Sequence, residues 1–281
     1  MENDKMSFFE HLGELRRRLL WIVVILFAVF IIVFNYSELL LKGLMFPMRN
    51  ELVFHLKSPY AHFVPKATKV TNLVFLEPAE AFWMHIKLSM MAAFFISFPL
   101  ILGQIWMFIS PGLHKKEKKY VLPFISAGTI LFISGMAFCF LIVLPFALGF
   151  LLTYKTESLT PMISIGNYVD FMLKFLLAFG LIFELPIAIV SLARFGIVTP
   201  EKLAKSRRYA IVIAFIAAGI LTPTPDAFNQ TLMAVPIIVL YEVGIIAAKL
   251  MFPKKRDEDT KDGEAVKDEA SGSVTMTERK D

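Results

Sequence analysis

Long apolar runs constrain this chain more than any other feature. Several stretches of eighteen or more residues hold few or no charged side chains, which is typical of helices that cross a membrane. Hydrophobic residues make up 57% of the 281 residues, more than in ordinary soluble domains. The sequence therefore predicts an all-α integral membrane protein. Six spans are expected, at residues 19–41, 82–108, 122–145, 169–193, 209–221 and 228–248.

Basic residues distinguish the two sides of this predicted bundle. The loops at 114–119 and 202–208 hold four lysines or arginines each, whereas the loop at 153–158 holds one and that at 222–227 holds none. Lysine and arginine accumulate in the cytoplasmic loops of membrane proteins. We therefore expect a multi-pass protein with both termini in the cytoplasm.

The predicted membrane domain covers residues 1–250. Prolines and apolar residues are scattered through its long outside loop, 42–79, which suggests a small packed cap. From Asp257 onward the chain is polar, charged and free of aromatic residues. Such a segment cannot bury enough apolar surface to fold, so we expect a disordered cytoplasmic tail at 251–281.

The sequence lacks the usual motifs of soluble enzymes. It has no phosphate loop of the G-x-x-x-x-G-K-[ST] kind and no cluster with metal-ligand spacing. Its single cysteine, Cys139, lies in an apolar run and excludes an internal disulfide. We therefore expect no enzyme activity, no cofactor, no metal and no nucleic-acid partner.

The last two predicted spans are short. About thirteen residues separate Arg208 from Pro223, or ~20 Å of helix against a hydrocarbon core of ~30 Å. The sixth span has a charge-free core only from Thr231 to Tyr241, which contains Pro236 and ends at Glu242. Either snorkelling side chains extend both helices, or this hairpin thins the surrounding bilayer.

A glutamate at the mouth of the first span needs an explanation. Ser7 and Glu10 match a capping box, which predicts a helix that begins near Phe8. On that helix Glu14 can reach the arginines three and four positions later. The simplest interpretation is therefore that Glu14 pairs with its own helix.

A second interpretation links Glu14 to the first cytoplasmic loop. There Glu117 is the one acid among Lys115, Lys116, Lys118 and Lys119. Two acids in basic surroundings stay ionised and can bind a cationic peptide. The spacing alone does not decide between self-pairing and peptide binding.

Polar residues inside the fourth span mark a second candidate site. Glu184 lies near the middle of this span, and Pro186 leaves the carbonyl of Ile182 without its helical partner. A carboxylate at this depth costs about 2.5–3.5 kcal/mol, so Glu184 should face the bundle interior or a hydrated cavity. Asp170 and Lys174 lie one turn apart and are expected to pair.

Gln230 begins the sixth span on the outer side. A side-chain amide at this position can form a hydrogen bond with another helix inside the bilayer. We therefore expect Gln230 to contribute to the binding of a partner helix.

Several motifs together resemble the TatC family, whose members are receptor subunits of the twin-arginine protein translocase. The similar stretches are "HLGELRRRLL", "EPAEAFWMHIKLS", "QIWMFISPGLHKKEKKYVLPF", "FELPIAIV", "SRRYAIVIAF" and "DAFNQTLMAVPIIVLYEVGI". They occur in order from about residue 7 to 250 and include all six predicted spans.

This resemblance implies a concave, glove-like bundle of six helices in the cytoplasmic (inner) membrane. It implies recognition of signal peptides with consecutive arginines and transport of folded proteins driven by the proton-motive force. It also implies single-span partners of the TatA and TatB types, contact with membrane lipid, and a homo-oligomer within a larger complex.

The resemblance further implies roles for individual residues. Signal-peptide binding is implied for Glu14, Arg16, Phe108 and Glu117. Transport or groove positions are implied at Pro47, Pro111, Glu184 and Asp226. The chain reads "LTPTPDAF" where the family more often has L-x-P-P-D, so Thr224 is an additional residue beside Asp226.

Two alternative functions are compatible with parts of the sequence. A proton-coupled transporter of small solutes would use Glu184 with Asp170 and Lys174, and it usually needs repeat-related halves with broken helices. The two halves of this chain show no such pairing. The other alternative is a membrane scaffold without transport activity, and crosslinking to an arginine-pair signal peptide separates all three.

Overall fold

The computed structural model describes residues 8–54, 61–65, 73–109, 121–153, 162–194, 196–221 and 227–251. Predictions that concern Pro111, Glu117, Thr224, Asp226 and the tail beyond Met251 lie outside these described residues.

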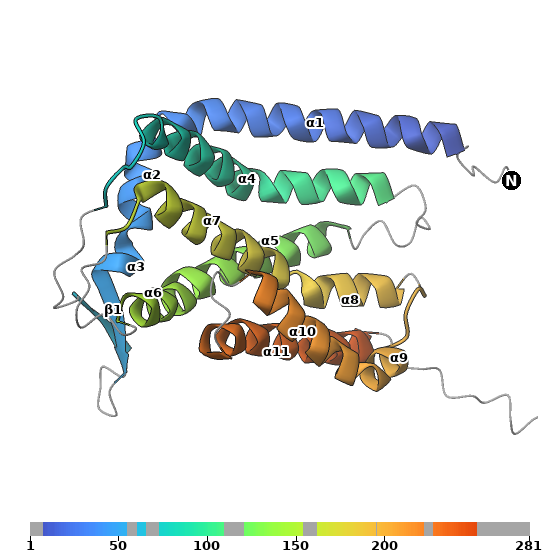
Figure 1. Ribbon diagram of the computed structural model, residues 1–281. Helices are drawn as coiled ribbons and strands as arrows, with labels where there is room; N and C mark the ends of the chain where they lie inside the picture. Colours follow the sequence, from blue (N-terminus) through green and yellow to red (C-terminus); the bar gives the residue numbers. More distant parts are fainter. Residues whose placement is uncertain are drawn as a thin grey trace, which may run out of the picture.

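The described chain is mainly helical (Figure 1). In chain order the helices are α1 (Phe8–Phe34), α2 (Ser37–Leu44), α3 (Phe46–Arg49), α4 (Glu80–Ile109), α5 (Val121–Phe138), the π-helical turn η3 (Cys139–Val143), α6 (Leu144–Thr153), α7 (Ile165–Ile182), α8 (Leu185–Arg194), α9 (Pro200–Lys205), α10 (Arg207–Leu221) and α11 (Ala227–Met251). The predicted all-α class is confirmed. A small antiparallel ribbon of β1 (Asn50–Phe54) and β2 (Ala61–Pro65) is added in the loop at 42–79.

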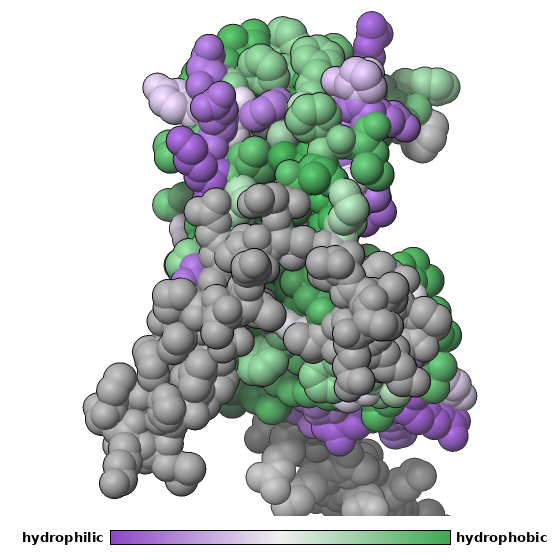
Figure 2. Space-filling view, turned by 60° about the vertical axis from the view of Figure 1, so that its left-hand side comes forward, coloured by the Kyte–Doolittle hydropathy of each residue, from purple (hydrophilic) through white to green (hydrophobic). Residues whose placement is uncertain are grey.

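The long helices define two ends of the molecule (Figure 1). The proximal end holds the start of α1, the ends of α4 and α8, and helix α9. The distal end holds α2, α3, the ribbon and the start of α7. Apolar residues cover much of the coloured surface in Figure 2, and hydrophilic residues gather in separate groups.

Helix α1 lies alongside α4 (Figure 1). Its less exposed residues recur mainly every three or four positions and so form one stripe: His11, Glu14, Arg18, Ile22, Ile25, Leu26, Val29, Phe30 and Val33. On α4 the buried residues Ser89, Ala93 and Ser97 are four positions apart and share a face with Gln104, which bonds Arg18. Such small residues let two membrane helices approach closely. The stripe places Glu14 on the side of α1 that faces α4.

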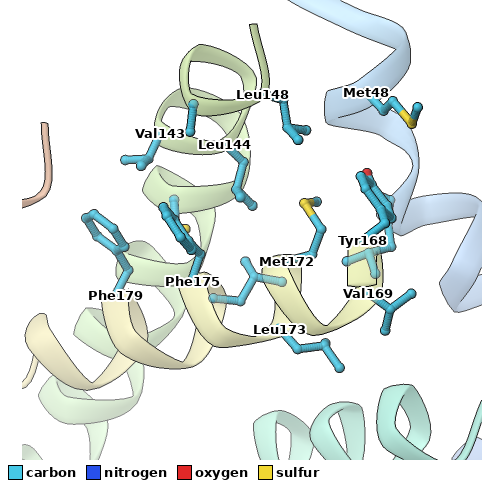
Figure 3. Packing of buried hydrophobic residues seen from close by; sticks show 14 of the residues in the cluster. Met48, Val143, Leu144, Leu148, Tyr168, Val169, Met172, Leu173, Phe175 and Phe179 are labelled. Atoms are coloured by element: carbon cyan, nitrogen blue, oxygen red, sulfur yellow. The ribbon is translucent and has the colours of Figure 1, made fainter. Parts of the chain in front are cut away.

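The main hydrophobic core surrounds α7. Figure 3 shows the α7 side chains facing residues of η3, α6 and α3; those labelled are Met48, Val143, Leu144, Leu148, Tyr168, Val169, Met172, Leu173, Phe175 and Phe179. The buried Tyr168 hydroxyl donates a 2.8 Å hydrogen bond to the Leu44 carbonyl oxygen. This bond joins α7 to the last turn of α2.

Two predicted spans form as interrupted helices. The span expected at 122–145 continues through η3 and α6 to Thr153, and Pro145 lies two residues after the π-helical turn. Proline has no amide hydrogen to donate, and π-helical turns occur at such irregularities. The span expected at 169–193 consists of α7 and α8, which meet at Phe183 and Glu184.

Five helical segments are long and apolar enough to cross a membrane: α1, α4, the α5–α6 run, the α7–α8 run and α11. Helix α10 has 15 residues, or ~22 Å, so its short length is as predicted. The final span was expected at 228–248, and α11 covers this range with 25 residues. Its part before Glu242 is nevertheless only 15 residues long. Local thinning of the bilayer stays a prediction.

The first predicted span also has different bounds. It was expected at 19–41, but the described part of α1 runs from Phe8 to Phe34. Ser7 lies outside the described residues, so the capping box stays a prediction. The chain turns at Asn35 and Tyr36, and α2 then starts as a separate helix. Residues 37–49 thus form part of the cap, in which Pro47 is fully buried at the start of α3.

Candidate functional site

The Glu14 carboxylate is held by two arginines of its own helix. Its Oε2 lies 2.7 Å from Arg17 Nη2, and its Oε1 lies 2.6 Å from Arg18 Nε. The Glu14 side chain is only 12% exposed, whereas that of Arg17 is 64% exposed and that of Arg18 is 20% exposed. The predicted self-pairing is therefore confirmed, and the two guanidinium groups differ in how firmly they are enclosed.

Contacts with α4 fix the position of this cluster. Arg18 Nη1 donates to Gln104 Oε1 at 3.1 Å and also lies 3.4 Å from the Met107 sulfur. One turn away, the His11 ring stacks on Phe108, with ring centroids 4.3 Å apart. Phe108 therefore lies close to the Glu14 cluster, and its implied role in signal-peptide binding stays a prediction. Sequence reasoning missed His11 and Gln104. The spacing of three and four residues between His11, Glu14 and Arg18 could have shown that His11 shares the face of α1 that holds Glu14.

Arg16 lies on another side of α1 and is exposed. Its side chain therefore does not pair with Glu14, unlike those of Arg17 and Arg18. Glu117 and Pro111 lie outside the described residues, so the predicted pairing of Glu14 with Glu117 in one site stays a prediction.

Glu184 occupies the break between α7 and α8. Helix α7 ends at Ile182, the residue whose carbonyl was expected to lose its partner through Pro186. The Glu184 carbonyl oxygen then accepts from the Ala188 amide at 2.9 Å, which restarts the helix as α8. The backbone break thus positions one carboxylate at a defined depth in the bundle.

The Glu184 side chain lies against α5. A Cβ atom built on Gly128 would lie 3.1 Å from Glu184 Oε2 and 2.8 Å from a methyl carbon of Leu102. Within the described residues, the buried Oε1 has no hydrogen-bond partner. The expectation that Glu184 faces the bundle interior therefore agrees with its position, and a glycine on α5 makes room for it.

The expected pairing of Asp170 with Lys174 is wrong. Asp170 instead accepts from Lys87 of α4, at 2.9 Å to Oδ1 and 2.8 Å to Oδ2. The two residues are 83 positions apart, so helical spacing gives no signal for this pair. The pair joins the distal halves of α4 and α7.

Gln230 has a partner within the described chain. Its Nε2 donates to the Phe215 carbonyl oxygen of α10 at 3.0 Å, and Gly219 lies close enough that an added Cβ would be 3.1 Å from the same nitrogen. This bond joins α10 to α11. A role in binding a partner helix stays a prediction, beside this contribution to the hairpin.

Two further contacts join the proximal parts of α9, α10 and α11. Glu242 pairs with Arg207 at 2.7 Å, and the Tyr241 hydroxyl donates to the Leu203 carbonyl oxygen at 2.9 Å. Sequence reasoning used Glu242 only as the end of an apolar stretch and missed both contacts.

These features define an integral membrane protein with several spans, a charged cluster where α1 and α4 meet, and a carboxylate at a break inside the bundle. A family model described as "Sec-independent protein translocase protein (TatC)" matches residues 10–236. This match covers most of the chain, and the chain belongs to the TatC family.

Relatives and solved structures agree with this assignment. A TatC protein of Halothiobacillus neapolitanus is 41% identical over 254 residues, which cover 90% of this chain and 65% of that protein. A TatC protein of Carboxydothermus hydrogenoformans is 39% identical over 255 residues, or 91% of this chain and 98% of that protein. A crystal structure of "Twin Arginine Translocase Receptor- TatC in DDM" is 36% identical, has a TM-score of 0.73, and covers 85% of this chain and 99% of that chain.

The predicted family is thereby confirmed. The protein is a multi-pass translocase subunit of Sec-independent protein transport, and it is a transport protein, not an enzyme. Family membership also implies a Tat translocase complex with other Tat components.

Proposed function

We propose that this chain is the receptor for twin-arginine signal peptides in its translocase, and that the Glu14 cluster holds one of the two signal arginines. The proximal end then lies on the cytoplasmic side of the inner membrane, with both termini there. The charge of the loops supports this orientation, because 202–208 holds four basic residues and includes parts of α9 and the start of α10.

One observation supports the role of Glu14 most directly. Its carboxylate already binds two guanidinium groups, at 2.6 and 2.7 Å. The forked guanidinium donates two hydrogen bonds to a carboxylate in a geometry that the ammonium of lysine cannot match. Each resident arginine contributes one of these two contacts, and a signal arginine in place of Arg17 can add a second bond from its fork, which gives a physical reason for arginine in the signal.

The exposure of the two resident arginines indicates which one a signal arginine replaces. Arg18 is mostly enclosed and is bonded to Gln104 of α4, so it holds Glu14 in place. Arg17 is 64% exposed, and an exposed ion pair is worth only about 0.2–1 kcal/mol. An incoming guanidinium can therefore exchange with Arg17 while Arg18 stays bound.

The second signal arginine is assigned to Glu117. The two acids belong to separate cytoplasmic segments, and each is assigned one arginine of an extended peptide, so both acids are needed. Phe108, stacked on His11 beside Glu14, offers an apolar and aromatic surface for the residues around the arginine pair. Arg17 and Arg18 keep Glu14 ionised, and the exposed Arg16 adds positive charge that repels cations which cannot pair closely.

The remaining predicted residues are assigned to transport and assembly. Glu184 would line a hydrated groove during transport, and roles in transport are also assigned to Pro47 in the cap, to Pro111 and to Asp226. Gln230 would contribute to the docking of TatA-type and TatB-type helices, within an assembly that contains several copies of this chain. Transport of folded proteins would be driven by the proton-motive force.

Photo-crosslinking of a twin-arginine signal peptide to the full-length membrane protein tests the receptor role. Glu14→Gln and Glu117→Gln should each reduce the crosslink, and the double variant should lose it. Glu201→Gln is the matched control, because Glu201 is an exposed acid of α9 at the same end. Wild-type crosslinking by the double variant, inserted at wild-type levels, would contradict the proposal.

A substitution at Arg17 tests the exchange. Arg17→Gln removes the resident competitor, so the signal peptide should bind more tightly. Lys205→Gln, which removes an exposed positive charge from α9, should leave binding unchanged. Weaker binding by Arg17→Gln would show that Arg17 does not compete with the signal.

A further inference from the structure

Two adjoining recesses lie between α4, α7 and α10 in the distal half of the molecule. One has a volume of about 320 Å³ and is lined by residues that include Glu77, Trp83 and Lys87. The other has a volume of about 260 Å³ and reaches Lys174 and the end of α10. Asn167 and Asp170 line both recesses, so the two meet along one face of α7.

The charges in these recesses lie inside helices that are long enough to span the membrane. Lys87 is seven residues after the start of α4, and Lys174 is nine residues after the start of α7. At 1.5 Å per residue these positions are about 10 and 14 Å along their helices. Charged side chains at such depths are costly unless they pair or reach water, and they often mark a functional site.

The two lysines differ in their partners. Lys87 is paired with both oxygens of Asp170, as described above. Lys174 is exposed and forms no ion pair with any described residue. An unpaired ammonium at this depth favours an anion, and lipid phosphate is the anion most available within the bilayer interface.

The end of α10 forms one wall of the recess around Lys174, through Ile220 and Leu221. The Lys174 side chain is exposed in this recess. A lipid headgroup can therefore reach Lys174 from the surface, while its acyl chains remain against the apolar surface.

We propose that these two recesses bind the headgroup of an ethanolamine phospholipid. Its phosphate accepts hydrogen bonds from the Lys174 ammonium and the Asn167 amide. Its own ammonium donates to Asp170, whose side chain is 36% exposed and whose oxygens have lone pairs beyond those used by Lys87. The neighbouring cation and anion of the site match the anion and cation of this headgroup.

The same geometry discriminates between lipids. A choline headgroup has an equal charge and the same phosphate, but its quaternary ammonium has no N–H to donate to Asp170. A glycerol headgroup brings the phosphate without a cation and leaves its negative charge close to Asp170. The site should therefore prefer ethanolamine to choline and to glycerol phospholipids.

Native mass spectrometry of the delipidated full-length protein tests this site, with dioleoyl lipids of the three headgroups as probes. The ethanolamine lipid should bind about tenfold more tightly than the choline lipid, which is the change expected for one hydrogen bond to a charged group. Lys174→Gln should weaken its binding by a similar factor. Asp170→Asn should make the ethanolamine and choline lipids bind alike.

Controls separate this site from general lipid adhesion. Lys202→Gln removes an exposed lysine from α9 and should leave lipid binding unchanged, and Lys174→Arg should retain the ethanolamine lipid. Equal binding of all three lipids, or unchanged binding by Lys174→Gln, would overturn the proposal. If soluble glycerophosphoethanolamine protects the protein against heat as well as the ethanolamine lipid does, the site binds a free headgroup. This result would contradict a lipid ligand.

Discussion

Gly135 of α5 is the position where an added methyl group should disturb the bundle most. A Cβ atom there would lie 2.7 Å from the Phe179 carbonyl oxygen and 2.7 Å from Phe183 Cγ. Carbon atoms in favourable contact are ~3.5–4.0 Å apart, so Gly135→Ala overlaps both groups by about 0.8 Å or more. The carbonyl belongs to the backbone of α7 and cannot rotate away. Helix α5 must therefore move away from α7.

The expected loss of stability follows from two opposing contributions. Overpacking of a close-packed interior costs about 1–3 kcal/mol, and two rigid neighbours place Gly135→Ala near the upper limit. Replacement of glycine by alanine inside a helix stabilises the folded state by roughly 0.5–1 kcal/mol. The net destabilisation is about 2 kcal/mol, which lowers the melting temperature by about 4–8 °C on the scale of a domain of this size.

Cys139 provides the assay. It is the single cysteine of the chain, is 0% exposed, and lies one helical turn after Gly135. A fluorogenic thiol reagent therefore reports the opening of this region as the detergent-solubilised protein is heated. Gly149→Ala is the matched control, because a Cβ at Gly149 meets no atom within 4 Å, and it should melt at or above the wild-type temperature. Equal melting of Gly135→Ala and wild type would refute the close approach of α5 and α7.

Three further substitutions test individual contacts. Tyr168→Phe leaves the buried Leu44 carbonyl oxygen without its donor and should cost about 1–3 kcal/mol in the same thiol assay, whereas Tyr209→Phe on the exposed face of α10 should cost little. Gly166→Ala would place a Cβ atom 2.7 Å from Glu80 Oε1, which accepts hydrogen bonds from Ser164 and from the Gly166 amide. This substitution should therefore destabilise the distal end. The same substitution in a Glu80→Ala background should have a smaller effect. Gln230→Leu removes the bond to Phe215 and should reduce crosslinking to TatA-type or TatB-type helices while signal-peptide binding is retained; unchanged crosslinking and transport would remove Gln230 from the partner site.

Features that depend on local sequence were predicted well. Pro186 predicted the break after Ile182. This break depends on backbone groups within four residues, which a sequence shows directly. The pairing of Glu14 with Arg17 and Arg18 belongs to the same class, because all three residues lie within two turns of one helix.

Contacts between distant helices could not be predicted in this way. Asp170 has one candidate partner four residues away on its own helix, yet it pairs with Lys87 of α4. In a chain with this many apolar residues, almost every face of a helix is hydrophobic, so periodicity does not show which face meets which neighbour. The bonds of Arg18 to Gln104 and of Gln230 to Phe215 have the same origin.

A double-mutant cycle tests the central claim, that Glu14 binds an arginine of the signal peptide, most directly. The dissociation constants of a labelled twin-arginine peptide and of its twin-lysine counterpart are measured with the wild-type protein and with Glu14→Gln. In the wild type, the exchange of arginine for lysine should weaken binding by about tenfold or more, since hydrogen bonds to charged groups contribute roughly 1.5–3 kcal/mol. With Glu14→Gln most of this preference for arginine should disappear. The same arginine-to-lysine ratio in both proteins would show that Glu14 does not contact the signal arginines and serves only to pair with Arg17 and Arg18.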